Sequence, residues 1–248
     1  MRPLWFEFPD NPLTFAAEDE FLLGPGLLVK PVSAPGVDHA DTLLPKESIW
    51  YESISGGVMG KDTWLKGRPQ VSRLGVHMDS IPVFYRGGHI ITRRERARRS
   101  TQQQARDPFT LVVALDQAGT AQGDLYVDDG RSFAFKRGVY THRSFSFAGL
   151  KLRNAPYPTP AGLPPGTWDP DLKIERVVIL GLPKGQSYEV TLSGESGKAR
   201  RLEAAPGGAD PGLPPAHGEA IVIRAPGTPL GKDWELSLSP AGKAAAQV

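Results

Sequence analysis

Short apolar runs, separated by Gly, Pro and Asp-Gly pairs, recur along almost the whole chain. Residues 27–32 are mostly apolar, and Pro25-Gly26 separates them from the apolar residues 21–24. A helix does not continue through such breaks, so we predict strands in both places. Similar runs predict further strands at residues 48–53, 81–86, 89–91, 109–115, 124–127, 132–136, 139–147, 173–180, 187–192, 219–224 and 233–239. Short strands joined by turns predict an all-β fold of two antiparallel β-sandwiches.

Residues 2–9 alternate in the manner of a strand. Leu4, Phe6 and Phe8 would fall on one side of this strand, and Trp5 and Glu7 would fall on the other. A free domain rarely begins with a strand directly behind its initiator Met. We therefore expect the sequence to be a fragment of a longer protein.

A polar, basic segment interrupts the strand pattern in the middle of the chain. Residues 93–106 hold six arginines and the single acidic residue Glu95, and they show no apolar stripe. We interpret this segment as a solvated, briefly helical connector between two domains. The predicted organisation is a proximal sandwich at 1–92, a distal sandwich at 107–240 and a disordered tail at 241–248.

The composition excludes several classes of protein. The 248 residues contain no Cys, which excludes a disulfide framework, a thiolate metal site and a cysteine nucleophile. No apolar run approaches the roughly 20 residues that a membrane helix needs. Lys and Arg number 29 against 27 Asp and Glu, and this near balance argues against nucleic acid as the main partner.

The pair Asp128-Asp129, followed by Gly130, is the most acidic spot between predicted strands. A carboxylate pair could serve glycoside hydrolysis or calcium binding. However, adjacent strand residues point to opposite faces, whereas two carboxylates that act on one sugar sit about 5–9 Å apart across a cleft. We therefore favour a turn, in which one Asp bonds to its own backbone. Because the Asp-Gly pair lies between alternating segments, it also predicts a hairpin of the strands on either side.

The other candidate residues do not gather along the sequence. They are the histidines His39, His77, His89, His142 and His217 and the tryptophans Trp5, Trp50, Trp64, Trp168 and Trp234. The histidines lack metal-ligand spacing, and large aromatic residues of a sandwich lie mostly in its core rather than stacking on sugars. The arginines of 93–99 could bind phosphates, acidic lipid or a partner, but we favour a solvated linker. We assign no catalytic, cofactor-binding or metal-binding residue.

The order of several segments resembles the C-terminal part of glycoside hydrolase family 31. In the first half these segments are MRPLWFEFP at 1–9, FLLGPGLLVKPV at 21–32, Leu44-Pro45 shortly before IWY at 49–51, and IPVFYRGGHII at 81–91. In the second half the segments similar to the family's α-glucosidases of the glucosidase II type are LVVAL at 111–115, GTAQGDLYVDDG at 119–130, RSFSF at 143–147 and IERVVILG at 174–181. The resemblance covers residues 1–240 and weakens in the Pro/Gly-rich loops 156–171 and 204–217.

The resemblance implies a (β/α)₈ barrel followed by a proximal and a distal C-terminal β-sandwich. It also implies a retaining mechanism, with an aspartate nucleophile and an aspartate acid/base on loops of the barrel. The nucleophile motif, such as Trp-x-Asp-Met-Asn-Glu, does not occur in this sequence. No catalytic residue can be carried over, and we expect the chain by itself to be inactive. A barrel-facing surface left bare would be an exposed apolar patch.

The resemblance further implies partners and a location. The partners are the missing catalytic barrel of the same polypeptide, a lectin-like β-subunit, and the oligosaccharide substrate of N-glycan glucose trimming, bound through the full enzyme. The location is the lumen of the endoplasmic reticulum, although the chain carries no targeting signal. We expect no cofactor, no nucleic acid and no membrane among the partners. Two alternatives stay open: a free-standing carbohydrate-binding module, and a protein-interaction module that uses the arginine-rich connector.

Overall fold

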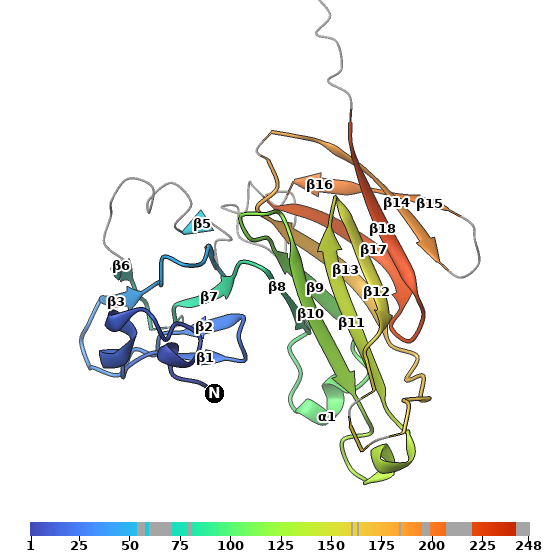
Figure 1. The fold of residues 1–248 in the computed structure, drawn as a ribbon, viewed down its shortest axis with the longest axis horizontal. Helices are drawn as coiled ribbons and strands as arrows, with labels where there is room; N and C mark the ends of the chain where they lie inside the picture. The colour runs from blue at the N-terminus through green and yellow to red at the C-terminus, as the bar shows by residue number, and fades with distance from the viewer. Residues whose placement is uncertain are drawn as a thin grey trace, which may run out of the picture.

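The computed structural model describes residues 1–53, 58–59, 71–78, 81–159, 161–162, 164–183, 185–194, 199–206 and 220–241. Almost all regular structure in these ranges is strand, so the predicted all-β class is confirmed. Figure 1 shows two lobes, a first lobe from the N-terminal residues and a larger second lobe from the rest. In the described part of the chain, no helix is long and apolar enough to cross a membrane.

The first lobe is built on a five-stranded antiparallel sheet with the strand order β1-β2-β7-β4-β5. Its strands are β1 (Phe21–Leu23), β2 (Leu27–Val29), β4 (Trp50–Glu52), β5 (Val58–Met59) and β7 (Val83–Arg86). A separate antiparallel pair consists of β3 (His39–Leu43) and β6 (Val71–Gly75). Two short 3-10 helices precede the strands, η1 (Leu4–Phe6) and η2 (Pro12–Ala16).

The predicted strand over residues 2–9 is wrong. The backbone closes on itself there, because the amide of Phe8 donates to the carbonyl of Leu4 at 3.0 Å, which leaves only Arg2 to bridge to Leu22. Leu4 and Phe8 are both buried, and a spacing of four residues brings them to one side of a helical turn. The exposure of Phe6 excludes the strand, because the alternation placed it on the same side as Leu4 and Phe8, yet it is 63% exposed.

The second lobe is one eleven-stranded sheet with the order β15-β14-β18-β12-β11-β10-β8-β9-β13-β17-β16. Its strands are β8 (His89–Arg93), β9 (Phe109–Ala114), β10 (Ala121–Val127), β11 (Thr141–Ala148), β12 (Lys151–Pro156), β13 (Lys173–Leu180), β14 (Tyr188–Gly194), β15 (Arg200–Leu202), β16 (Ala204–Pro206), β17 (Ile221–Pro229) and β18 (Trp234–Pro240). The pairings are antiparallel except for β8 with β10 and β9 with β13, which are parallel. The short helix α1 (Thr101–Gln104) lies within the predicted connector.

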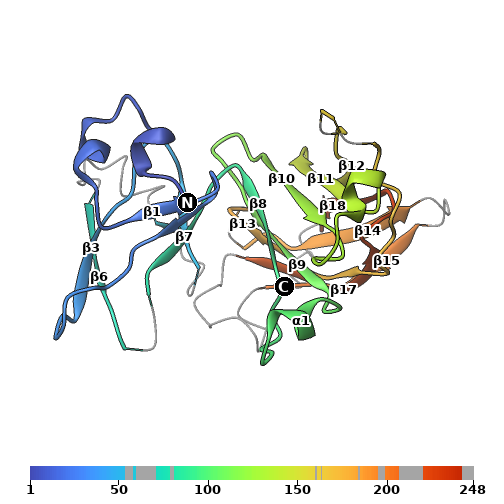
Figure 2. The same ribbon diagram turned by 90° about the horizontal axis from the view of Figure 1, so that it is seen from below.

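The large sheet folds over, so that its two halves enclose one core. Leu111 and Val113 of β9 share a buried cluster with Phe145 of β11 and Leu236 of β18, which lie far away in the strand order. Figure 2 shows β10, β11 and β12 in one layer above β9 and β17 in the other. This arrangement of two layers over one core is a β-sandwich.

One predicted strand and one predicted hairpin of the second half are wrong. Residues 132–136 do not form a strand, and most of them belong to the 3-10 helix η3 (Ala134–Arg137), which ends at Gly138 with φ +86°. Strands β10 and β11 do pair antiparallel, but residues 128–140 connect them instead of a two-residue Asp-Gly turn.

The chain passes from the first sheet to the second at Gly87 and Gly88. Strand β7 pairs with β2 and β4, whereas β8, directly after it, pairs with β9 and β10. A Cβ atom on Gly87 would lie 2.8 Å from the carbonyl oxygen of Leu115, so no larger residue fits there without a shift. The domain division after residue 92 stays a prediction, and the hydrogen bonding changes sheet at residues 87–88.

The two lobes share a buried cluster. Ile49, Tyr51 and Tyr85 of the first lobe pack in it against side chains of the second lobe, namely Val112, Ala114, Val178, Leu180, Ala220 and Val222. The Tyr51 hydroxyl donates to the carbonyl of Leu115 at 2.7 Å. All six residues of β9 are buried, because one face of this strand lines the core of the sandwich and the other meets the first lobe.

Candidate functional site

The two 3-10 helices of the first lobe turn apolar side chains toward the solvent. The exposed fractions are 87% for Met1, 43% for Trp5, 63% for Phe6, 51% for Leu13 and 59% for Phe15. We call these five residues the N-terminal apolar patch. Figure 1 shows η1 and η2, in dark blue, at the surface of the first lobe.

In η2 a polar side chain is buried and its apolar neighbours are exposed. Thr14 is fully buried and its hydroxyl donates to the carbonyls of Phe8 and Asn11, while Leu13 and Phe15 on either side face outward. The side chain of Asn11 caps this turn by accepting from the amide of Leu13 at 3.2 Å. The outward position of the apolar side chains therefore follows from a specific hydrogen-bond pattern, not from a frayed segment.

The aromatic members of the patch form a shaped surface. The rings of Trp5 and Phe6 stack with centroids 4.6 Å apart and an interplanar angle of 14°. Trp5 and Phe15 line one hollow of about 490 Å³ together with Phe21. Clustered exposed apolar residues of this kind mark interaction sites in soluble proteins.

A buried carboxyl group lies at the edge of this hollow. Glu20 is 5% exposed, and its side chain accepts from the amide of Leu43 at 3.1 and 3.2 Å. Burial raises the pKa of Glu20 to about 7, against the opposing charge of Lys30. Lys30 in turn pairs with Asp19 at 2.5 Å.

A charged cluster ties η1 to the sheet of the first lobe. Arg86 of β7 donates to Glu7 at 3.0 Å and lies 4.4 Å from the ring centre of Phe8, while Arg2 reaches the same carboxylate at 2.5 Å. Partial burial acts to raise the pKa of Glu7, but hydrogen bonds from Arg2 and Arg86 outweigh it and lower that pKa. The turn that carries Trp5 and Phe6 is thus fixed to β7 rather than loosely attached.

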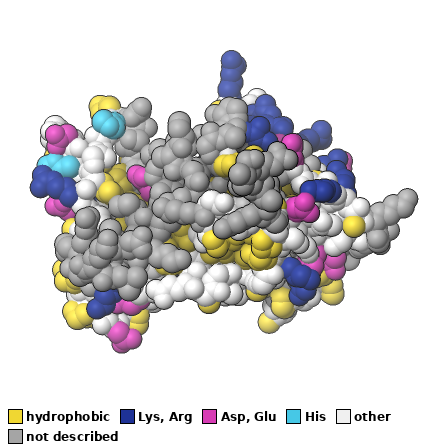
Figure 3. All heavy atoms as spheres, turned by 90° about the horizontal axis from the view of Figure 1, so that it is seen from above, with side chains coloured by type: hydrophobic (Ala, Val, Ile, Leu, Met, Phe, Trp, Pro, Cys, Tyr) yellow, Lys and Arg dark blue, Asp and Glu magenta, His cyan; other side chains and the backbone are white. Residues whose placement is uncertain are grey.

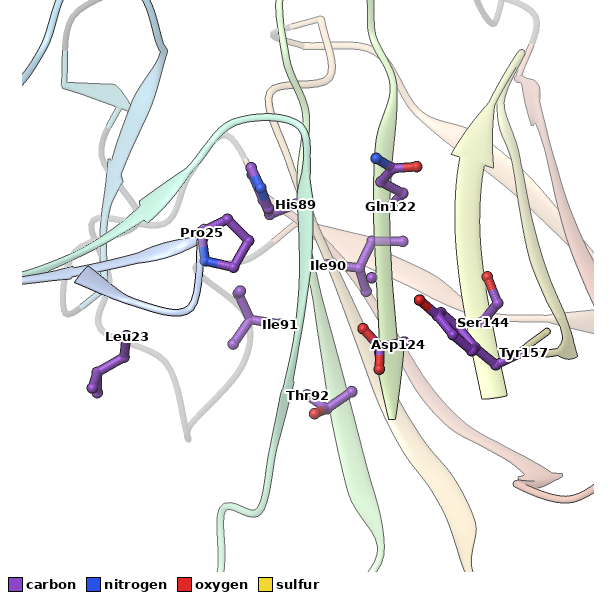
Figure 4. Close-up of a pocket in the computed structure, with 12 residues that line it drawn as sticks. Leu23, Pro25, His89, Ile90, Ile91, Thr92, Gln122, Asp124, Ser144 and Tyr157 are labelled. Atoms are coloured by element: carbon purple, nitrogen blue, oxygen red, sulfur yellow. The ribbon is translucent and has the colours of Figure 1, made fainter. Parts of the chain in front are cut away.

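A second hollow lies on the outer face of the large sheet, where the first lobe meets it (Figure 4). Its floor consists of β8 and β10, one wall is the β1–β2 turn with Pro25, and the opposite wall is Tyr157. The volume is about 430 Å³. We call this hollow the β8–β10 groove.

Two of the four described histidines lie at or beside this groove, and the other two lie elsewhere. His89 lines the groove, and His142 bonds to Asp124 at 2.8 Å beside it. His39 pairs with Asp38 at 2.7 Å, and His77 is exposed. His217 lies outside the described residues. Among the described residues, no group of three His, Asp or Glu side chains could hold a metal ion.

The interpretation of the Asp128-Asp129-Gly130 segment as a turn is confirmed. The Asp128 side chain accepts from the amide of Gly130 at 2.8 Å, and that of Asp129 accepts from the amide and hydroxyl of Ser132. These bonds to Ser132 lower the pKa of Asp129 to about 2. Both carboxylates therefore serve local backbone geometry.

Several arginines of the basic segment are engaged within the molecule. Arg98 holds Asp107 through two bonds of 2.7 and 2.8 Å, and Arg96 reaches Glu175 at 2.7 Å. The guanidinium of Arg94 lies 4.2 Å from the ring centre of Phe109. On the face seen in Figure 3, basic side chains lie mostly toward the end formed by the second lobe, with acidic ones beside several of them.

The tryptophans do not form an exposed row in the described part of the chain. Trp50 and Trp234 are buried, as expected for a sandwich core, and Trp168 is half-buried. Trp5 belongs to the N-terminal apolar patch, and Trp64 lies outside the described residues. The sequence patterns missed Leu13, Phe15 and Tyr157, because a single apolar residue in a turn carries no periodicity.

Comparison with known proteins identifies the family. Residues 1–91 match the model of the glycosyl hydrolase family 31 C-terminal domain. The chain is 37% identical over 241 residues to neutral alpha-glucosidase AB of Mus musculus, covering 96% of this chain and 23% of that protein. The chain belongs to glycoside hydrolase family 31. The matching region is the C-terminal part of the family, as the resemblance implied.

Further similarities agree with this family 31 assignment. The chain is 35% identical over 239 residues to a probable glucan 1,3-alpha-glucosidase of Arabidopsis thaliana, covering 96% of this chain and 24% of that protein. A crystal structure of glucosidase II alpha subunit superposes with a TM-score of 0.80 at 29% identity, covering 96% of this chain and 25% of that one. The chain thus spans about a fifth to a quarter of the length of its curated relatives.

Proposed function

We propose that this chain is the non-catalytic C-terminal portion of an α-glucosidase, and that it packs on the catalytic barrel and stabilises it. The N-terminal apolar patch is the observation that carries the proposal. Its five residues are exposed although both turns are fixed: hydrogen bonds at Thr14 and Asn11 hold η2, and bonds to Glu7 from Arg2 and Arg86 hold the end of η1. A fixed, outward apolar surface in a chain that matches a quarter or less of its relatives fits a contact with the rest of such an enzyme.

Removal of apolar area from water would drive this contact. Covering a patch of this kind contributes about 25 cal/mol for each Å² of apolar surface buried. Since the buried cluster with Tyr51 and Tyr85 already joins the two lobes, the patch contact would link barrel, first lobe and second lobe into one unit. Such a unit would hold the barrel loops that carry the carboxylates.

The chain by itself is expected not to hydrolyse glycosides. Glycosidic cleavage needs an acid and a second carboxylate on opposite sides of one bond, about 5–9 Å apart. The acidic pair singled out by the sequence, Asp128 and Asp129, is engaged in turn hydrogen bonds. We assign the chemistry to the barrel of the full enzyme.

The full enzyme is proposed to hydrolyse α-glucosidic bonds during glucose trimming of N-glycans in the endoplasmic reticulum. This rests on similarity to neutral alpha-glucosidase AB and to glucosidase II alpha subunit. One similar structure, with a TM-score of 0.78, is a heterodimeric complex of the ER glucosidase II catalytic subunit with the binding domain of its regulatory subunit. We propose a regulatory subunit of that kind as a partner.

The test joins this chain to a catalytic domain. A chimera carries the mouse relative's sequence up to the matching region, followed by the 248 residues of this chain. We expect no turnover of an aryl α-glucoside by the chain alone and measurable turnover by the chimera. The double change Trp5→Ser and Phe6→Ser should lower the Tm of the chimera and leave that of the isolated chain unchanged.

The matched control is Phe133→Ser, which alters a ring that is 74% exposed and lies outside the patch. It should leave the chimera's Tm unchanged. Turnover by the isolated chain would contradict the non-catalytic assignment. Equal Tm values of the patch variant and the unchanged chimera would contradict the proposal that the patch contacts the catalytic domain.

A further inference from the structure

The floor of the β8–β10 groove contains a glycine where the two strands approach closely. A Cβ atom on Gly123 would lie 2.2 Å from the carbonyl oxygen of Ile90, so β8 and β10 approach each other at a spacing that excludes any side chain. Gln122 and Asp124 flank this bare stretch on β10. Strand periodicity places these two side chains on the same, outer face of the sheet.

The wall opposite the first lobe is an aromatic ring fixed in position. The ring of Tyr157 stacks on His142 with centroids 3.9 Å apart and an interplanar angle of 16°. His142 is held in turn by its 2.8 Å bond to Asp124 and by the edge contact of Tyr126. In Figure 4 the Tyr157 ring lies beside Ser144, with its hydroxyl directed toward Asp124. The ring is 41% exposed although one face is covered, so it is available to a ligand without rearrangement.

Polar groups of complementary type line the groove. Asp124 is half exposed, and only its Oδ2 is engaged within the described residues, which leaves Oδ1 as an acceptor. Burial lowers the pKa of His89, so its ring is neutral at pH 7. The Nδ1 group of His89 lies 3.3 Å from the carbonyl of Gly87, which requires the proton on Nδ1 and leaves Nε2 as an acceptor. Ser144 adds a hydroxyl that both donates and accepts.

We propose that the β8–β10 groove binds a neutral pyranose ring of an oligosaccharide, as a binding subsite without chemistry of its own. The C–H face of a pyranose would stack on the open side of Tyr157, where the negative face of the aromatic ring attracts weakly positive C–H groups. The Asp124 carboxylate would accept from one or two sugar hydroxyls, since bonds to a charged acceptor are the strong ones. A free carboxylate in the groove disfavours an anionic sugar.

The size and shape of the groove agree with this ligand class. Its volume of about 430 Å³ lies within the range of small-molecule sites, and its lining mixes one aromatic ring with a few convergent polar groups. The proposal concerns binding and not hydrolysis. It therefore stands or falls independently of the contact with a catalytic domain.

The test is a titration of the full, ¹⁵N-labelled chain, followed by its amide shifts. The probes are methyl α-D-glucopyranoside, methyl α-D-mannopyranoside, nigerose and maltotriose, with glucuronic acid as the anionic counterpart. We expect at least one neutral probe to bind with a Kd on the order of 1 mM. The shifts should centre on the amides of Gly123, Asp124, Ser144 and Tyr157, with no comparable effect of glucuronic acid.

Variants separate a binding role from a structural one. Tyr157→Ala should weaken binding about tenfold, while Tyr157→Phe should stay within about twofold, because the ring and not the hydroxyl carries the stacking. Asp124→Asn keeps an oxygen beside His142 but removes the charge. This variant should bind neutral sugars a few-fold more weakly and lose its discrimination against glucuronic acid, which a purely structural role would not change. Phe133→Ala, remote from the groove, is the matched control and should bind as the unchanged chain does.

Three outcomes would overturn the proposal. The first is the absence of groove shifts with all four neutral probes at about 50 times the expected Kd. The second is binding by a folded Tyr157→Ala variant as tight as that of the unchanged chain. The third is a map of shifts centred on the N-terminal apolar patch, which would indicate nonspecific apolar contact instead.

Discussion

The two lobes of this family 31 chain differ in how they obtain their cores. The second lobe folds one sheet over itself, and residues such as Phe145 and Leu236 from distant strands fill the space between its layers. The small sheet of the first lobe instead needs cover on both faces. Its own 3-10 helices cover the Trp50 side, and the second lobe covers the Tyr51 side. The comparison indicates that the second lobe encloses its core by itself, whereas the first lobe depends on the second lobe for cover. Under the function proposed above, the first lobe would be an adapter between the second lobe and the catalytic barrel.

The largest expected effect on stability follows from a cavity in the core of the second lobe. Phe145→Ala deletes a fully buried ring in the second lobe and should lower the free energy of unfolding by about 3–5 kcal/mol. Because the first lobe depends on that core, hydrogen exchange should accelerate in β2 and β7 as well as in β11. In Leu4→Ala, which opens only the core of the first lobe, exchange in β11 should stay slow. Equal acceleration of both lobes by both variants would contradict the one-sided dependence.

The next effect is a pH dependence of stability that arises from one buried carboxyl group of the first lobe, Glu20. The pKa of Glu20 rises from 4.5 to about 7 on folding, so between these values the folded state binds a proton that the unfolded state has released. The stability is therefore full below pH 4.5, falls as the pH rises through this window, and is lowest above about pH 7. Burial is the main cause of the raised pKa of Glu20, while the charge of Lys30 reduces the shift and that of Asp19 adds to it.

The variant Glu20→Gln tests this dependence, because it keeps an oxygen acceptor for the amide of Leu43 but cannot titrate. We expect denaturant unfolding of this variant to lose the slope between about pH 5 and pH 8, a difference on the order of 2–3 kcal/mol. Glu235→Gln is the control. The hydrogen bond from Arg153 lowers the pKa of the Glu235 carboxylate to about 2, so this group does not titrate between pH 5 and pH 8. An unchanged slope in Glu20→Gln would assign the dependence to other groups.

A smaller effect tests the crossing between the lobes. In Gly87→Ala the new methyl group would meet the Leu115 carbonyl at 2.8 Å, and the forced shift should cost about 1–3 kcal/mol in denaturant unfolding. Gly75→Ala is the matched control, because nothing lies within 4 Å of its Cβ position. Equal stability of the two variants would show that the lobes shift apart there without cost.

The smallest effect concerns one hydrogen bond between the lobes. Tyr51→Phe removes the donor to the Leu115 carbonyl and should lower the free energy of unfolding by about 1 kcal/mol. Tyr157→Phe, at a half-exposed ring, should change it by less than about 0.5 kcal/mol. If Tyr51→Phe lowers the free energy of unfolding no more than Tyr157→Phe does, apolar packing alone joins the lobes.

Strand β9 was predictable from its continuous apolar run, whereas strand β12, which has an inward Asn, was not. Residues 109–115 predict β9 closely, because both faces of that strand are buried and almost every position is apolar. Strand β12 gave no signal, since its inward position 154 is an Asn. That side chain is buried with its bonds satisfied by Arg143 and by the carbonyls of Leu230 and Lys232. Alternation cannot reveal a strand whose inner face is polar and internally bonded.

The sequence by itself determined the all-β class, the order of most strands and the family, because apolar runs, turn residues and ordered segments are local properties of the chain. The tertiary structure decided which apolar residues stay outside and which polar ones converge. Leu13 and Phe15 are exposed because a buried Thr14 and a capping Asn11 fix their turn. Asp124, His142 and Tyr157 meet only because three neighbouring strands bring them to one face of the sheet. Such proximity depends on register and on packing between distant segments, and no local pattern encodes it.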